Sequence, residues 1–169
     1  GIGQTQFYGA DGHAWFPLEE HRRDVPLNRI SPHLQHAVVA IEDHRFHSHF
    51  GIDPIGIGRA IVRDLRAGGL EEGGSTLTQQ LARTLFLSSS RDFTRKGKEA
   101  VLAVMIGRRL SKPQILELYL NRIYLGGSVY GVEAMSRNVF GKSAADVTLP
   151  EAALIAGLIQ RPSALSPWD

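Results

Sequence analysis

Cap-forming residues followed closely by proline mark where helices begin in this chain. Ser31-Pro32 and Asp53-Pro54 each place a side chain that favours the helix N-cap before a proline suited to the first helical position. At Ser111–Gln114 and Thr148–Glu151, a hydroxyl residue is followed three positions later by glutamine or glutamate, which predicts capping boxes. These start signals predict a mainly α fold.

Apolar residues recur at helical spacing between these starts. Leu34, Val38 and Ile41 belong to one stripe, and Glu42 stands at its end, so the fold itself positions this acid. Further helices are expected over residues 54–67, from Leu77 to Phe86 with Ser75 as the cap, from about 92–94 to 110, and over 130–140 with Gly141 as the C-cap.

The length of 169 residues corresponds to a single domain, residues 1–169, with a core of its own. Residues 1–30 are expected to form an irregular or short extended arm, since turn signals at 9–12 and at Pro17 interrupt them. The absence of cysteine excludes disulfides and thiol catalysis, and a net charge of only +2 argues against nucleic acid as a partner. No apolar stretch has the length of a membrane span and no signal peptide is visible, so an anchor would lie outside this sequence or membrane contact is peripheral.

Two acids, Glu42 and Glu99, stand in different surroundings. Glu42 lies where an apolar stripe meets a polar, histidine-rich turn, and Glu99 follows the cations Arg91, Arg95 and Lys96. Taken alone, Glu99 is best interpreted as part of a helix-surface ion pair. Together with the polar segment 73–80 between them, the two acids suggest a general base combined with an anion clamp.

The segment Gly73-Gly74-Ser75-Thr76 opens a predicted helix and could bind an anion through free backbone N–H groups. A flexible turn with a good cap explains it at least as well. Gln79 and Gln80 suit sugar hydroxyls, and Arg83 suits phosphate oxygens.

Histidines at positions 44, 47 and 49 do not have a zinc-site spacing, so a surface or structural role is favoured and no metal ligands are assigned. Asp43 could orient its neighbour Glu42, or the two could be a plain polar pair at a helix end.

Four motifs follow one another in a fixed order. Residues 42–51 read Glu-Asp-His-Arg-Phe-His-Ser-His-Phe-Gly, residues 73–81 Gly-Gly-Ser-Thr-Leu-Thr-Gln-Gln-Leu, residues 95–100 Arg-Lys-Gly-Lys-Glu-Ala, and residues 112–121 Lys-Pro-Gln-Ile-Leu-Glu-Leu-Tyr-Leu-Asn. With segments 126–142 and 149–158, they resemble the family 51 glycosyltransferases. This is the peptidoglycan glycosyltransferase domain of class A penicillin-binding proteins and of monofunctional biosynthetic transglycosylases. The resemblance runs from about Pro26 to Ser166.

The resemblance implies a lysozyme-like, mainly helical fold and an inverting transfer that polymerises lipid II through β-1,4 bonds and releases undecaprenyl diphosphate. It makes Glu42 the general base and places Glu99 on the side that holds the diphosphate. The motif positions expected to bind substrate are Asp43, Phe46, His49, Gly74, Ser75, Thr76, Gln79, Gln80, Arg83, Arg91, Arg95 and Lys96.

The implied partners are lipid II, the growing glycan strand, the membrane surface and moenomycin-type inhibitors. The implied location is the bacterial cell envelope, at the outer face of the cytoplasmic membrane. No firm cofactor is implied, although Mg²⁺ or another divalent cation could bridge acids and the diphosphate. Residues 54–72 fall where the family has a mobile, membrane-facing flap, and an ordinary helix with a core face and a solvated basic face is the competing interpretation.

The chain departs from the family pattern at three places: Arg83 stands where many members have lysine, Asn138-Val139 replaces two tyrosines, and Gly107 occupies a stretch where members often carry an acid. Two rival functions remain. A lysozyme or lytic transglycosylase would share the fold and a glutamate, and a non-catalytic lipid II-binding module would tolerate loss of both acids.

Overall fold

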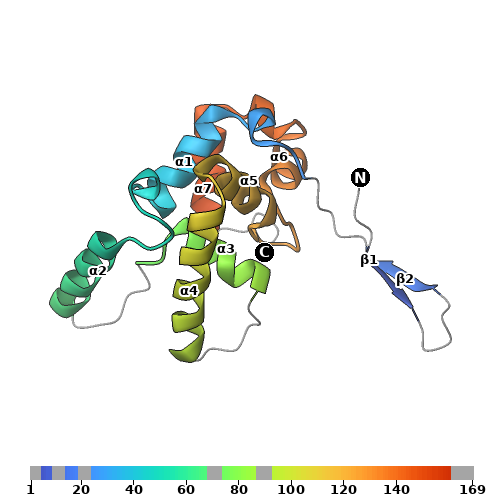
Figure 1. Cartoon of the computed structure of the whole chain (residues 1–169). Helices are drawn as coiled ribbons and strands as arrows, with labels where there is room; N and C mark the ends of the chain where they lie inside the picture. The colour runs from blue at the N-terminus through green and yellow to red at the C-terminus, as the bar shows by residue number, and fades with distance from the viewer. Residues whose placement is uncertain (1–4, 9–13, 19–23, 68–73, 87–92, 161–169) are drawn as a thin grey trace.

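The computed structural model describes residues 5–8, 14–18, 24–67, 74–86 and 93–160 (Figure 1). These residues contain seven α-helices: α1 (Pro32–Glu42), α2 (Pro54–Ala67), α3 (Leu77–Phe86), α4 (Phe93–Arg109), α5 (Lys112–Arg122), α6 (Val132–Phe140) and α7 (Leu149–Gln160). Three short 3-10 helices also occur, η1 (Leu27–Arg29), η2 (Phe46–Ser48) and η3 (Ala144–Asp146). The mainly α, lysozyme-like fold expected from the sequence is confirmed.

Two short strands lie in the N-terminal region, β1 (Thr5–Tyr8) and β2 (Ala14–Leu18). They pair antiparallel, with Thr5 opposite Leu18 and an irregularity between Phe7 and Tyr8. The extended structure predicted for the N-terminal arm is therefore present in its described part.

The hydrophobic core is one cluster of buried side chains from α1, α3, α5, α6 and α7. Ile115, Tyr119 and Leu120 of α5 are at most 2% exposed. Leu34 of α1 and Ile155 of α7 are fully buried, and these two helices pack against each other. Burying a side chain of this size stabilises a fold by about 1.5–3 kcal/mol, so these contacts fix the helices that carry the site.

Residues 24–30 are held against α5 by hydrogen bonds. The side chain of Asn121 accepts the Val25 N–H and donates to the Val25 carbonyl, both at 2.9 Å. Glu117 accepts the Leu27 N–H at 2.8 Å, and Ile30 is only 2% exposed. These contacts depend on hydrogen-bond partners from α5, which the local sequence does not reveal.

Most predicted helix starts form as expected. Ser111 and Gln114 make both hydrogen bonds of a capping box. Glu151 accepts the N–H of Thr148 at 2.8 Å and its hydroxyl at 2.6 Å. At the start of α2, Asp53 accepts the backbone N–H two residues ahead at 3.1 Å.

Ser31 occupies the N-cap position of α1, but its hydroxyl donates to the Val147 carbonyl at 2.7 Å instead of capping the helix. Its N–H donates to the Ala144 carbonyl at 2.8 Å, so the start of α1 is tied to the segment before α7. Gly141 ends α6 in the left-handed conformation with φ +69°, as predicted.

Glycines allow α4 to approach the loop between η2 and α2 at backbone distance. Gly51 has φ +98°, and a Cβ there would overlap the Ala103 carbonyl oxygen of α4. A Cβ on Gly107 would lie 2.7 Å from the carbonyl carbon of Phe50. This contact gives a physical reason for glycine at position 107.

Gly107→Ala is expected to lower the free energy of unfolding by about 1–3 kcal/mol, because the added methyl overlaps the Phe50 backbone. Gly97→Ala is the matched control on the same helix, since nothing lies within 4 Å of its Cβ position. The control should gain up to about 1 kcal/mol from helix propensity. Urea denaturation measures both, and equal shifts in the two variants would contradict the close contact.

Candidate active site

Glu42 is the last residue of α1, and two other helices supply its surroundings. Gln80 of α3 donates its side-chain N–H to Glu42 Oε2 at 2.8 Å. Tyr119 of α5 donates its hydroxyl to the other end of the same amide, Gln80 Oε1, at 3.0 Å. Glu42 Oε1 is buried and has no hydrogen-bond partner among the described residues. One carboxylate oxygen is thus held by a hydrogen bond, while the other is buried without one.

Burial raises the pKa of Glu42 above its ordinary value of 4.5. The hydrogen bond from Gln80 and the positive charge of Arg83 lower it, and the neighbouring charge of Asp43 raises it, with the balance upward. A carboxylate with a raised pKa is a stronger proton acceptor, so Glu42 has the property that a general base needs.

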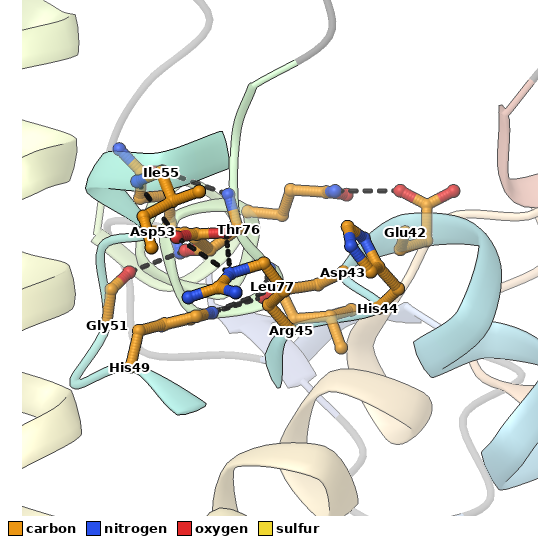
Figure 2. Close-up of polar contacts among 12 residues, drawn as sticks. Glu42, Asp43, His44, Arg45, His49, Gly51, Asp53, Ile55, Thr76 and Leu77 are labelled. Atoms are coloured by element: carbon orange, nitrogen blue, oxygen red, sulfur yellow. Dashed lines mark hydrogen bonds and ion pairs between the residues drawn. The ribbon is translucent and has the colours of Figure 1, made fainter. Parts of the chain in front are cut away.

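Asp43 points away from Glu42 into the protein and joins three segments (Figure 2). Both of its carboxylate oxygens lie 3.0 Å from His49 Nε2, and Oδ2 accepts the Leu77 N–H at 3.1 Å. Asp43 and His49 are 7% and 6% exposed, and Phe46 between them is fully buried. These three predicted substrate-binding residues therefore lie beneath the surface, where they hold the end of α1 against the start of α3.

The buried ammonium group of Lys112 completes this layer. It lies 4.3 Å from the centre of the Phe46 ring. Burial lowers the pKa of Lys112, and the charge of Asp43 partly offsets that effect. Lys112 thus balances the negative charge of Asp43 without reaching the surface as a ligand group.

The cap of α3 is Thr76 and not Ser75, so the sequence-based prediction was wrong by one residue. Thr76 accepts the Gln79 N–H at 3.1 Å, and Gln79 Oε1 accepts the Thr76 N–H at 2.9 Å, which makes a reciprocal capping box. The Thr76 hydroxyl also donates to the Gly51 carbonyl. Because Thr76 and Gln79 are 2% and 3% exposed, they shape the segment rather than line a surface.

Ser75 is free of capping and instead accepts a hydrogen bond from the ammonium group of Lys96. The same nitrogen lies 3.3 Å from Glu99 Oε2, and Arg95 Nε lies 3.4 Å from Glu99 Oε1. Glu99 is 2% exposed, whereas the Lys96 side chain is 55% exposed. The buried acid therefore holds two cations in place, and Lys96 presents its charge beside the start of α3.

Of the remaining predicted substrate-binding residues, the structure describes Gln80, Gly74 and Arg83 but not Arg91. Gln80 and Gly74 are half-buried, Arg83 is exposed, and Gly74 packs against Ala60 of α2. Arg91 lies outside the described residues, and so does Gly73, which precedes Gly74 in its motif. Within the described part of the chain, no group of three or more histidine and acidic residues could hold a metal ion, so assistance by Mg²⁺ stays a prediction.

Two supporting residues, Tyr119 and Arg45, were not singled out from the sequence. Tyr119 was quoted within a motif but given no role, and its signal was a hydroxyl on an otherwise apolar helix face. Arg45 lies 3.1 Å from Asp53, which is 5% exposed and caps α2. Burial raises the pKa of Asp53, but hydrogen bonds from the Gly56 N–H and Arg45 outweigh it and bring the pKa below its usual value. This pair connects the loop after α1 to the start of α2.

The apolar side chains of α2 do not form an ordinary core face. Ile55, Ile61 and Leu65 are 55%, 54% and 78% exposed, and Arg59 lies on the same helix. Figure 1 shows α2 extending away from the other helices. Among the helices that the structure describes, none is long and apolar enough to span a membrane.

Comparison with known proteins identifies the family. The transglycosylase family model matches residues 11–169. Penicillin-binding protein 1A of Escherichia coli (strain K12) is 48% identical over 163 residues, 96% of this chain and 19% of that protein. Penicillin-binding protein 1F of Bacillus subtilis (strain 168) is 45% identical over 148 residues, 88% of this chain and 21% of that protein.

The chain therefore belongs to the transglycosylase family, the peptidoglycan glycosyltransferases of family 51, as its motifs indicated. It spans about a fifth of the length of these curated relatives.

Asp43→Ala is expected to lower the free energy of unfolding by about 2–4 kcal/mol, because it leaves the Leu77 N–H and His49 without their buried partner. Asp146→Ala removes an exposed aspartate and should change stability by less than about 0.5 kcal/mol. Thermal and urea unfolding measure both variants. An Asp43→Ala protein as stable as the control would contradict the role of Asp43 as a buried joint.

Proposed function

We propose that this chain polymerises lipid II into β-1,4-linked glycan strands and releases undecaprenyl diphosphate. The observation that carries the proposal is the state of Glu42, whose Oε1 is buried and unpartnered while Gln80 holds Oε2 at 2.8 Å. In the proposed reaction, Oε1 takes the proton from the acceptor's 4-hydroxyl as that oxygen attacks the anomeric carbon of the donor. The bond from this carbon to the diphosphate breaks, and its electron pair leaves with the diphosphate.

The cations around Glu99 suit the leaving group. Lys96 and Arg95 lie 3.3 Å and 3.4 Å from the Glu99 carboxylate, which fixes their positions before a substrate arrives. Preorganised cations stabilise the charge that develops on a departing diphosphate, and Arg83 adds a further exposed positive group. Attack from the side opposite the leaving group would make the transfer inverting.

Of the two rival functions, a hydrolase acting on polymeric glycan has no evident use for this cation cluster. A module that only binds lipid II would not need a carboxylate with a raised pKa. Both features therefore support transfer. A divalent cation such as Mg²⁺ could assist the diphosphate, and moenomycin-type inhibitors would compete for the same groups.

We also propose that α2 contacts the membrane surface on the outer face of the cytoplasmic membrane. Lipid II is a membrane lipid, so the site has to work at a bilayer. The exposed Ile55, Ile61 and Leu65 with Arg59 and Arg63 give α2 the combination of apolar and basic side chains that favours an interface with anionic lipid.

Glu42→Gln is expected to reduce glycan polymerisation by about 10²–10⁴-fold, since the amide cannot accept the proton. Gel analysis of labelled lipid II turnover measures the loss. Glu151→Gln, a half-buried capping acid on α7, is the matched control and should polymerise at the wild-type rate. Near wild-type polymer formation by Glu42→Gln would overturn the assignment of the base.

The pH dependence of kcat/KM should show an acid limb that reports Glu42. Because the pKa of Glu42 is raised, activity is lost as the pH falls through a midpoint above the ordinary value of 4.5. A rate profile for lipid II measured from acid to neutral pH tests this. An acid limb at or below 4.5 would mean that another group is the base.

Replacing Ile61 and Leu65 together by glutamate should reduce binding to vesicles that contain anionic lipid by about tenfold or more. The matched control replaces Leu149 and Leu154 of α7, which are 59% and 50% exposed, in the same way. Co-sedimentation measures both double variants. An equal or absent effect in the two proteins would count against α2 as the membrane contact.

A further inference from the structure

Tyr119 is a core residue whose hydroxyl reaches the candidate site. It is 2% exposed, and its neighbours on α5 are apolar core residues. Burial, helped by the negative charge of Glu42 and opposed by Arg83, raises the pKa of Tyr119 far above its usual value. The hydroxyl therefore keeps its proton at any working pH and acts as a hydrogen-bond donor.

The hydroxyl of Tyr119 and the carboxylate of Glu42 together favour one orientation of the Gln80 amide. A primary amide has an accepting oxygen at one end and a donating nitrogen at the other. Tyr119 donates to Oε1 at 3.0 Å, which leaves Nε2 directed at Glu42 Oε2 at 2.8 Å. An ionised carboxylate only accepts hydrogen bonds, so the opposite orientation would bring two acceptor oxygens together.

We propose that Tyr119 is a positioning residue for the glycosyl transfer, acting through Gln80 to hold Glu42 Oε2 and keep Oε1 directed at the acceptor hydroxyl. The proposal rests on the proposed function of Glu42 as the base. Tyr119, Gln80 and Glu42 belong to α5, α3 and α1, so their two hydrogen bonds also connect these three helices.

Loss of the Tyr119 hydroxyl should change both the orientation and the titration of Glu42. The groups that act on the pKa of Glu42 are Gln80 and Arg83 of α3, which lower it, and Asp43, which raises it together with burial. Freeing the Gln80 amide weakens a hydrogen bond to the charged carboxylate, and this raises the pKa of Glu42 further. The acid limb of activity then moves to higher pH.

The experiment compares Tyr119→Phe, Gln80→Ala and the double variant. Tyr119→Phe keeps the ring and removes only the hydroxyl. We expect its kcat for lipid II to fall by about 3–30-fold with little change in KM, and its acid limb to move to higher pH. Gln80→Ala should shift the acid limb at least as far. In the double variant the Phe substitution should add nothing to the effect of Gln80→Ala.

Ser136→Ala is the matched control, because it also removes a fully buried hydroxyl, which lies on α6 and donates to the Lys142 carbonyl. It should lower stability without moving the acid limb. Carbon-13 NMR titration of the Glu42 carboxyl provides a readout independent of turnover and should show a higher midpoint in Tyr119→Phe than in wild type. An unchanged midpoint, or effects of Tyr119→Phe and Gln80→Ala that simply add, would overturn the role of Tyr119. Loss of the proposed function alone would leave the NMR difference intact.

Discussion

The candidate site depends on the buried carboxylate of Asp43, which connects the end of α1 to His49 and to the start of α3. Asp43 comes directly after α1, accepts the N–H of Leu77 at the start of α3, and pairs with His49, which follows η2. Each partner is buried, so losing one would leave an unsatisfied polar group in the protein interior. Through this joint the end of α1 is fixed against α3, and the neighbouring Glu42 comes within hydrogen-bond distance of Gln80.

The two acids of the site are used in opposite ways. Glu99 is more deeply buried, and both of its oxygens face cations at 3.3–3.4 Å, so its charge serves to position Lys96 and Arg95. Glu42 has one anchored oxygen and one without a partner, in surroundings that raise its pKa. The two acids therefore differ in their immediate partners: Glu99 lies between two cations, whereas Glu42 accepts a hydrogen bond from a neutral amide.

Helix positions were predictable because their signals are local. Caps such as Ser111 with Gln114 are satisfied within four residues, so the sequence carries the complete interaction. The cap of α3 was predicted at Ser75 instead of Thr76 because a contact that is distant in sequence fixes Thr76. Its hydroxyl donates to the carbonyl of Gly51. The motifs named Glu42 and Gln80, but not the link from Tyr119, because three separate helices have to be placed before that contact exists. Periodicity gave α2 an apolar face without revealing that Ile61 and Leu65 are exposed.

The proposed transfer of a glycosyl unit from a diphosphate carrier to a sugar hydroxyl has a fixed stoichiometry that can be measured. Purified wild-type protein would be incubated with labelled lipid II, and released undecaprenyl diphosphate and new β-1,4 bonds would be counted in the same samples. Glu42 acting as a base toward a sugar hydroxyl predicts one carrier released for each bond formed, and no soluble fragments from added polymeric peptidoglycan. Carrier release without bond formation, or fragmentation of the polymer, would contradict the account.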